Sequence, residues 1–221
     1  MMKNLKSIMS VLLALWIIGV MPISARPRAK RVVMIALDGI SVPGFTTAHT
    51  PNLDNLLAQG ALSLTTRVVM PSVTSPNWTS HLTGSGPEQH GVVDNGWQID
   101  KKGFPAVEID KEGYYPSVFK VMKEEIPECK TAFYYNWINL FYPYNKKYLD
   151  EVSYLENDAY VLNYEKAFDF IVRNQDLPTL VFLYSVHTDH AGHAHKWMSA
   201  EYIKSIEEAD IPVSYTHLTL P

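Results

Sequence analysis

The sequence predicts an α/β fold with a mostly parallel central sheet flanked by helices, and two observations carry that prediction. Apolar runs that do not alternate with polar residues recur along the chain, which is typical of strands buried on both faces of a parallel sheet. Stretches with helical spacing separate these runs, so strand and helix alternate. The chain has 221 residues, enough for one domain with a sizeable core or for part of a larger one.

The first third of the chain shows this alternation in order. The run RVVMIALDG, residues 31–39, predicts a buried strand that ends on an aspartate and a glycine. The segment TPNLDNLLAQG, residues 50–60, predicts a helix with a threonine cap, a proline in its first turn and a glycine stop. Residues 61–70 predict a second strand. A short helix is then expected through Leu82, with Ser75 as its cap.

The rest of the chain continues the pattern after residues 94–115, which carry turn signals and are expected to form loops with short strands. Helices are predicted over 116–127, 156–175 and 198–211, and strands over 130–138 and 177–186. The apolar side of the longest helix is expected to hold Ala159, Leu162, Ala167, Phe170 and Ile171. The aromatic-rich segment 133–148 either packs in the core, which its large apolar area favours, or lines a substrate pocket.

Composition and charge exclude some classes of partner. The net charge is -4 with mixed signs and no long basic stripe, so nucleic acid is not indicated as a structural partner. Phosphate can still bind an acidic protein when metal ions supply positive charge. The one cysteine, Cys129, cannot form an internal disulfide or a CxxC metal site and is expected to be a packed thiol.

Residues 1–25 have the order of a secretory signal peptide. Lys3 and Lys6 precede an apolar run over 8–21, and small residues end at Ala25. A retained membrane anchor is the alternative, but the run is shorter than the ~20 residues that a span needs. Cleavage near Ala25 would place the protein in the periplasm or outside the cell, with no retained span.

The C-terminal segment PVSYTHLTLP, residues 212–221, follows the amphipathic helix predicted over 198–211 and continues neither that helix nor the alternation. It is similar to translated adaptor or read-through sequence. We therefore expect residues 212–221 to be a foreign tail on a C-terminally truncated chain, and we assign His217 no function. The remaining domain is then 26–211.

Hydroxyl-bearing residues gather at the start of the helix that follows residue 73. Thr74 opens that helix, where free backbone N–H groups and the positive end of the helix dipole favour an alkoxide and a phosphate. An alcohol becomes a nucleophile at neutral pH only with help from a base or a metal. Asn77 could direct an amide N–H at a phosphate oxygen. The alternative is that Thr74 is a helix cap, a common structural role.

Metal-ligating residue types occur at two further places. Asp189 and His193 lie four residues apart in the loop expected over HTDHAGHAH, residues 187–195, and a carboxylate and an imidazole both suit zinc. A histidine-rich surface segment is the alternative. Asp38 ends the first predicted strand, although Asp-Gly is also a plain turn signal. Since the carboxyl ends of parallel strands meet at one sheet edge, these residues and Thr74 could converge.

Four segments together resemble the alkaline phosphatase superfamily, and most closely its type I phosphodiesterase/nucleotide pyrophosphatase branch. In order along the chain, they are MIALDGI, TPNLDNLLAQGA, MPSVTSPNWTSHLTGSGPEQHGVVDN and YSVHTDHAGH. The resemblance covers roughly Arg31 to Asp210. It implies an alkaline-phosphatase-like fold, a small phosphate-ester or nucleotide-like substrate, and two zinc ions, the arrangement of two-metal hydrolases.

The resemblance also implies residue roles. Asp38 and Thr74 would bind one zinc ion, Asp189 and His193 would bind the other, and Asn77 would hold a phosphate oxygen. Thr74 would attack phosphorus and form a phospho-threonine intermediate. The family also uses a D-H-G run and a later histidine, and this chain contains neither. Ser75 stands where the family often has an aromatic residue, which leaves the nucleotide preference open.

The sequence therefore predicts an exported zinc-dependent hydrolase of phosphodiester or pyrophosphate bonds. A phosphate monoesterase or phosphonate hydrolase with the same site is the first alternative, and an inactive truncated relative is the second. A sulfatase is not indicated, because the chain has no C/S-x-P-x-R run. The sequence does not indicate an oligomeric state.

Overall fold

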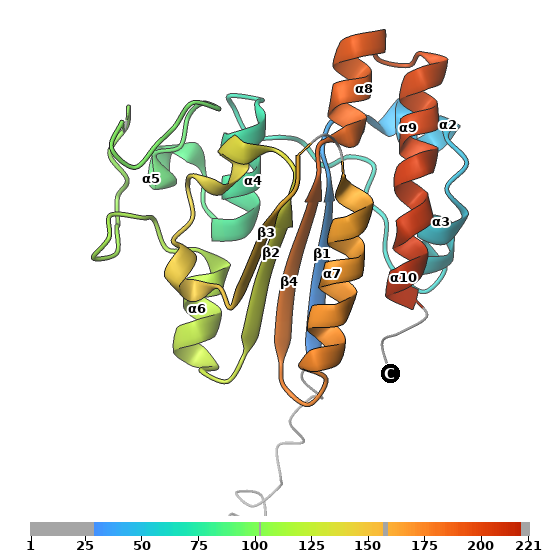
Figure 1. Cartoon of the computed structure of the whole chain (residues 1–221). Coiled ribbons are helices and arrows are strands. Elements are labelled where there is room, and N and C mark those ends of the chain that lie inside the picture. Colours follow the sequence, from blue (N-terminus) through green and yellow to red (C-terminus); the bar gives the residue numbers. More distant parts are fainter. Residues whose placement is uncertain (1–28, 102, 157–158, 218–221) are drawn as a thin grey trace, which may run out of the picture.

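The computed structural model describes residues 29–101, 103–156 and 159–217, which form an α/β arrangement around a parallel sheet (Figure 1). The predicted signal peptide, residues 1–25, and the last four residues of the predicted tail lie outside the described residues. Within the described part, no helix is long and apolar enough to cross a membrane.

The sheet has four strands in the order β1-β4-β2-β3, and every pair is parallel. Its strands are β1 (Arg31–Leu37), β2 (Lys130–Tyr135), β3 (Glu151–Tyr154) and β4 (Thr179–Ser185). The helices and 3-10 turns are α2 (Val42–Thr47), α3 (Pro51–Leu57), α4 (Thr74–Thr83), α5 (Pro87–His90), α6 (Val118–Glu125), η1 (Ile138–Phe141), η2 (Lys146–Tyr148), α7 (Tyr160–Arg173), α8 (His187–His195), α9 (Ala200–Asp210), η3 (Ile211–Val213) and α10 (Ser214–His217). The predicted α/β class with a parallel sheet is confirmed.

Side-chain alternation along the strands builds a core on each face of the sheet. Phe133 and Phe182 point to the face covered by α4, α6 and η1, and Tyr134 and Leu183 point to the face covered by α7. Figure 1 shows α6 and α7 on opposite sides of the strands. The aromatic segment 133–148 contributes mainly to the first of these cores, as the packing interpretation predicted.

Burial differs between the strands. All seven residues of β4 are buried, as predicted for a central strand. β1 is an edge strand among the described residues, and its burial is only partial. Met34 and Ala36 pack in one core and Val33 and Ile35 against the other, so both faces are covered as expected, but Val32 is 44 % exposed. Cys129 is a buried free thiol, as expected.

The predicted strand over 61–70 is wrong. These residues form an exposed irregular segment, with the side chains of Leu62 and Val68 turned largely to solvent. A strand needs a hydrogen-bonded neighbour, and the positions beside β1 and β3 hold no additional strand in the described part of the chain. The described residues of 94–115 likewise form turns and loops without the predicted short strands.

At two helix starts the predicted residue does not cap the helix. Residues distant in sequence accept the hydrogen bonds of the first N–H groups instead. Thr50 precedes α3 but makes no side-chain cap. Instead the Asp210 carboxylate accepts hydrogen bonds from the backbone N–H groups of Asn52, at 3.0 Å, and Leu53, at 2.8 Å. α4 begins at Thr74, one residue before the predicted cap Ser75.

Helices α7 and α9 were located correctly by their spacing. The buried side of α7 comprises Tyr160, Asn163, Tyr164, Ala167, Phe170 and Ile171. Leu162, expected on that side, is 50 % exposed because the two tyrosines occupy the face toward the sheet. After α9 the chain continues in the helical turns η3 and α10. The expectation that the helix ends before residue 212 is therefore wrong. The foreign origin of residues 212–221 stays a prediction.

A buried histidine links α5 to the helix that carries Thr74. The His90 side chain is 1 % exposed; its Nδ1 accepts a hydrogen bond from Val92 N at 3.1 Å, and its Nε2 lies 3.0 Å from Ser80 Oγ. With Nδ1 as the acceptor, Nε2 carries the proton and donates a hydrogen bond to Ser80 Oγ. Ser80 in turn donates to the Pro76 carbonyl at 2.9 Å. Burial lowers the pKa of His90 to about 4.

This histidine predicts a pH-dependent stability. Because the folded pKa is about 4 and the unfolded pKa is near 6.5, the stabilisation is complete above about pH 6.5 and is lost as pH falls toward 4. We expect the free energy of unfolding to fall by about 3 kcal/mol across that window through this residue alone. Urea unfolding at several pH values measures it, and His90→Asn is the reference variant. Equal pH slopes for the wild type and His90→Asn would contradict this assignment.

Candidate functional site

The candidate site lies at the carboxyl edge of the sheet, where β1 and β4 end beside each other (Figure 1). Leu37 pairs with Ser185 in register, and Asp38 N donates to the Ser185 carbonyl at 2.9 Å. The chain then turns at Gly39, which has a φ of +72°. Because of this pairing, the Asp38 side chain, which follows β1, lies next to α8, the helix that follows β4.

Asp38 is half-buried, and both oxygens of its carboxylate accept hydrogen bonds. Tyr184 Oη donates to Oδ2 at 2.6 Å, and Gly39 N donates to Oδ1 at 3.0 Å. Burial raises the pKa of Asp38, hydrogen bonding from Tyr184 lowers it, the negative charge of Asp189 raises it again, and hydrogen bonding from Trp78 and Thr74 opposes that rise. The net shift is upward. The first-strand carboxylate and the Thr74 hydroxyl are therefore neighbours.

Thr74 is the first residue of α4, which places its hydroxyl at the positive end of the helix dipole. The residue before it, Val73, has no side-chain oxygen to cap the helix. Asn95, in a distant loop, caps the helix instead, because its Oδ1 accepts a hydrogen bond from Ser75 N at 2.8 Å. The hydroxyl of Thr74 is consequently not needed as a cap.

Asp189 and His193 lie on one helix, α8, and not in the loop expected from the histidine-rich sequence. Their spacing of four residues places them on the same face, and His193 Nε2 is 3.6 Å from Asp189 Oδ1. Thr188 Oγ1 donates a short hydrogen bond to the Asp38 carbonyl and ties the helix start to β1. His187 instead contacts Glu208 at 3.2 Å and stacks on Tyr160.

One hollow of about 520 Å³ brings the predicted residues together. Its walls are formed by Asp38, Gly39, Ile40, Val68, Ser72, Val73, Thr74, Asn77, Asn95, Asp189, His193 and Trp197. All four predicted metal ligands and Asn77 are among them. Their placement is a property of the structure, and their chemical roles stay predictions.

Asn77 lines this hollow with its amide bonded to the preceding loop. Its Nδ2 donates to the Val73 carbonyl at 2.8 Å, and its Oδ1 accepts from Val69 N at 2.8 Å. In this arrangement the amide fixes the loop. To hold a phosphate oxygen, its N–H groups must turn away from backbone carbonyls.

Asn95 is a second amide on the hollow and was not among the residues predicted for the site. Its Oδ1 is engaged by Ser75 N, and Asn139 Nδ2 donates to its backbone carbonyl at 3.0 Å. Among the described residues its Nδ2 has no hydrogen-bond acceptor, so that N–H group is available to a ligand. The available signal was its place as the last residue of the segment MPSVTSPNWTSHLTGSGPEQHGVVDN, in a region interpreted only as loop.

The charges of the hollow fit a cation better than a bare phosphate. Asp38 and Asp189 bring two carboxylates together, and no lysine or arginine side chain from the described residues lines the hollow. A phosphate would be repelled unless a divalent cation lay between it and the carboxylates. Carboxylate, hydroxyl and imidazole donors suit such an ion. No group of three or more His, Cys, Asp and Glu residues in the described part could hold a metal alone.

Comparisons with known proteins identify the family of the chain. The family model for type I phosphodiesterase / nucleotide pyrophosphatase matches residues 32–220. The chain belongs to this family. Membership places it in a branch of the alkaline phosphatase superfamily, as the resemblance implied.

Similar type I phosphodiesterase sequences come from fungi and animals. An uncharacterized pyrophosphatase/phosphodiesterase of Schizosaccharomyces pombe is 25 % identical over 213 residues, covering 82 % of this chain and 39 % of the relative. Ectonucleotide pyrophosphatase/phosphodiesterase family member 3 of Mus musculus is 26 % identical over 192 residues, covering 81 % of this chain and 21 % of the relative. The chain thus spans well under half the length of these relatives.

Solved structures of the same family share the fold. Murine ectonucleotide pyrophosphatase/phosphodiesterase 5, as an inactive threonine-to-alanine variant in complex with AMP, superposes with a TM-score of 0.68 at 18 % identity. The match covers 86 % of this chain and 52 % of that one. The human protein 5 gives a TM-score of 0.66 at 17 % identity. The alkaline-phosphatase-like α/β fold expected from the sequence is confirmed.

Proposed function

We propose that the full-length protein is an exported zinc-dependent hydrolase of phosphodiester or pyrophosphate bonds, with Thr74 as its nucleophile. The observation that carries the proposal is the convergence of Asp38, Thr74, Asp189 and His193 on one hollow at the carboxyl edge of the sheet. Export rests on the signal-peptide pattern of residues 1–25. A nucleotide-like substrate is supported by the murine relative that binds AMP.

Thr74 is positioned for attack on phosphorus. Its hydroxyl lies beside the Asp38 carboxylate and at the start of α4, where the positive end of the helix dipole favours an oxyanion. In the first step the Thr74 hydroxyl gives up its proton to solvent, and its oxygen forms a bond to phosphorus while the bond to the leaving oxygen breaks. In the second step water attacks the phospho-threonine, and the Thr74 oxygen leaves as the hydroxyl.

The neighbouring residues orient these groups. Tyr184 and Gly39 fix the Asp38 carboxylate through its two oxygens. The free Nδ2 of Asn95 can donate to a phosphoryl oxygen and stabilise the negative charge that develops there, the role predicted for Asn77. Both amides belong to the hollow, and Asn95 Nδ2 has no acceptor among the described residues to release before it binds a ligand.

Divalent cations would complete the site. The family is metal-dependent. Asp38 and Thr74 would hold one ion, Asp189 and His193 would hold another, and further ligands would come from outside the described residues. When bound, such ions supply the positive charge that draws a phosphate into a hollow lined by two carboxylates.

Metal removal tests the zinc assignment. Chelation of the full-length protein should abolish hydrolysis of bis(4-nitrophenyl) phosphate, and added zinc should restore it. His193→Gln should raise the zinc concentration needed for half-maximal recovery about tenfold or more. His195→Gln, on the same helix but outside the hollow, is the matched control and should leave it unchanged. Recovery with magnesium alone would show that zinc is misassigned.

The same assay compares the diester with 4-nitrophenyl phosphate. A higher kcat/KM for the diester supports the phosphodiesterase, whereas a higher value for the monoester supports the monoesterase alternative. An inactive relative would hydrolyse neither compound with zinc present.

A further inference from the structure

An exposed tryptophan forms one wall of the candidate site. Trp197 lies in the short connection between α8 and α9, lines the hollow that holds Thr74, and is 46 % exposed. Its ring centroid is 5.6 Å from that of His193, a predicted metal ligand, at an interplanar angle of 65°. A large aromatic surface is therefore open to solvent directly beside the place proposed for the phosphate.

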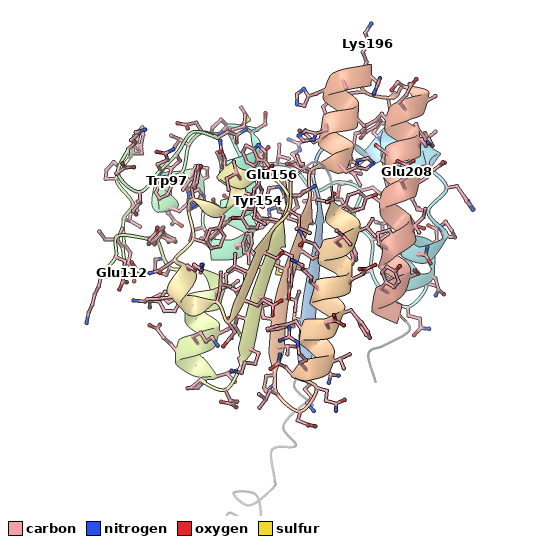
Figure 2. The ribbon with its side chains drawn as sticks, viewed as in Figure 1. Trp97, Glu112, Tyr154, Glu156, Lys196 and Glu208 are labelled. Atoms are coloured by element: carbon pink, nitrogen blue, oxygen red, sulfur yellow. The ribbon has the colours of Figure 1, made fainter. Side chains whose placement is uncertain are left out.

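The backbone on both sides of Trp197 is held in unusual conformations. Lys196 has φ 75° and ψ 148°, and Met198 has φ 67°. In the described part of the chain every other residue with positive φ is a glycine. Such conformations are costly for residues with a side chain and persist where the surroundings enforce them. The Lys196 side chain points away from the end of α8 (Figure 2), so the backbone conformation does not serve to bring that ammonium group to the hollow.

Packing fixes the indole against α8. A Cβ at Gly192 would lie only 2.2 Å from the six-membered ring of Trp197, so the ring rests where that glycine has no side chain. Tyr202, which is completely buried, packs edge-on at a ring distance of 5.2 Å. Tyr202 is itself anchored, because its hydroxyl donates to the Gly39 carbonyl at 2.8 Å. The exposed indole is thus held by the same loop that follows Asp38.

We propose that Trp197 is a specificity-determining residue that stacks on a planar aromatic group attached to the phosphate of the substrate. This inference rests on the proposed function. A fixed indole offers apolar area and a π-face at little cost in conformational freedom, and stacking tolerates any flat ring. The aromatic group is either a nucleobase on the retained side of the phosphate or an aryl ring on the leaving side.

The test compares two substrates with the same leaving group, in the full-length zinc-loaded protein. They are the 4-nitrophenyl ester of thymidine 5′-monophosphate and methyl 4-nitrophenyl phosphate. In Trp197→Leu, we expect kcat/KM for the thymidine ester to fall about tenfold relative to the methyl ester, mainly through KM. Trp197→Phe should recover most of the ratio. Phe104→Leu removes an exposed aromatic ring that does not line the hollow and should change nothing.

The remaining outcomes are distinct. A higher KM for the methyl ester itself in Trp197→Leu also supports the proposal and assigns the stacked ring to the leaving side. Unchanged KM values for both esters, with hydrolysis intact, overturn the proposal and leave the proposed function standing.

If the wild-type protein hydrolyses neither ester, the proposed function fails, and equilibrium binding of AMP and ribose 5-phosphate then decides the stacking separately. AMP affinity that falls in Trp197→Leu, with ribose 5-phosphate unaffected, supports it. Equal affinities of the wild type and the variant for AMP overturn it, as does an absence of AMP binding.

Discussion

Thr74→Ala in the full-length protein should lower turnover of a phosphodiester on the order of 10³-fold to 10⁶-fold, with folding intact. The hydroxyl is the only group on the first residue of α4 that can form a covalent bond to phosphorus, and it lies beside the Asp38 carboxylate. Its removal leaves a methyl group at a partly exposed position and opens no cavity in either core. The measurements are kcat/KM with bis(4-nitrophenyl) phosphate and the melting temperature.

Two further variants separate the nucleophile from helix stability. Thr74→Ser keeps a hydroxyl at the same place and should retain measurable turnover. Thr83→Ala removes a hydroxyl from the other end of α4, where it bonds to the Thr79 carbonyl and the Ser85 N–H, and should leave turnover unchanged. If Thr74→Ala turned over substrate at the wild-type rate, Thr74 would have no part in the mechanism.

The parts of the fold predicted correctly are those with a strong local pattern. β4 is a continuous apolar run in a central strand, and α7 and α9 have regular helical spacing. The segment 61–70 shows the limit of that reasoning. Its apolar residues match a strand locally, but a strand also requires a neighbouring strand with open hydrogen-bonding groups, and that condition belongs to the tertiary structure.

Long-range contacts also explain what the sequence could not predict about the site. Residues 187–195 contain a glycine and several histidines and were expected to form a loop, yet they form α8 because Trp197 packs on Gly192 and Thr188 bonds to the end of β1. Asn95 caps the start of α4 although it lies 20 residues from Ser75, whose N–H it accepts. The sequence could identify the chemical types of the site residues, but the contacts that hold them depend on pairs distant in the chain.

Gly39→Ala is expected to damage stability and metal binding together. Gly39 has a φ of +72°, and an added Cβ would lie 2.6 Å from Asp189 Cα and 2.9 Å from Asp189 Cβ. The clash is with backbone, so β1 and α8 would have to move apart, and the two carboxylates would separate. We expect the free energy of unfolding to fall by about 2–4 kcal/mol and zinc affinity to fall about tenfold or more.

Gly84→Ala supplies the matched control for this prediction. Gly84 has nearly the same conformation, with a φ of +67°, but an added Cβ there would meet no atom within 4 Å. Its substitution should therefore cost only the strain of the left-handed backbone, about 1–2 kcal/mol, and should leave zinc affinity unchanged. Urea unfolding and calorimetric zinc titration of both variants measure the difference. If Gly39→Ala and Gly84→Ala lowered stability and zinc affinity equally, the prediction would be contradicted. The close approach of β1 and α8 would then not be what positions the carboxylates of Asp38 and Asp189.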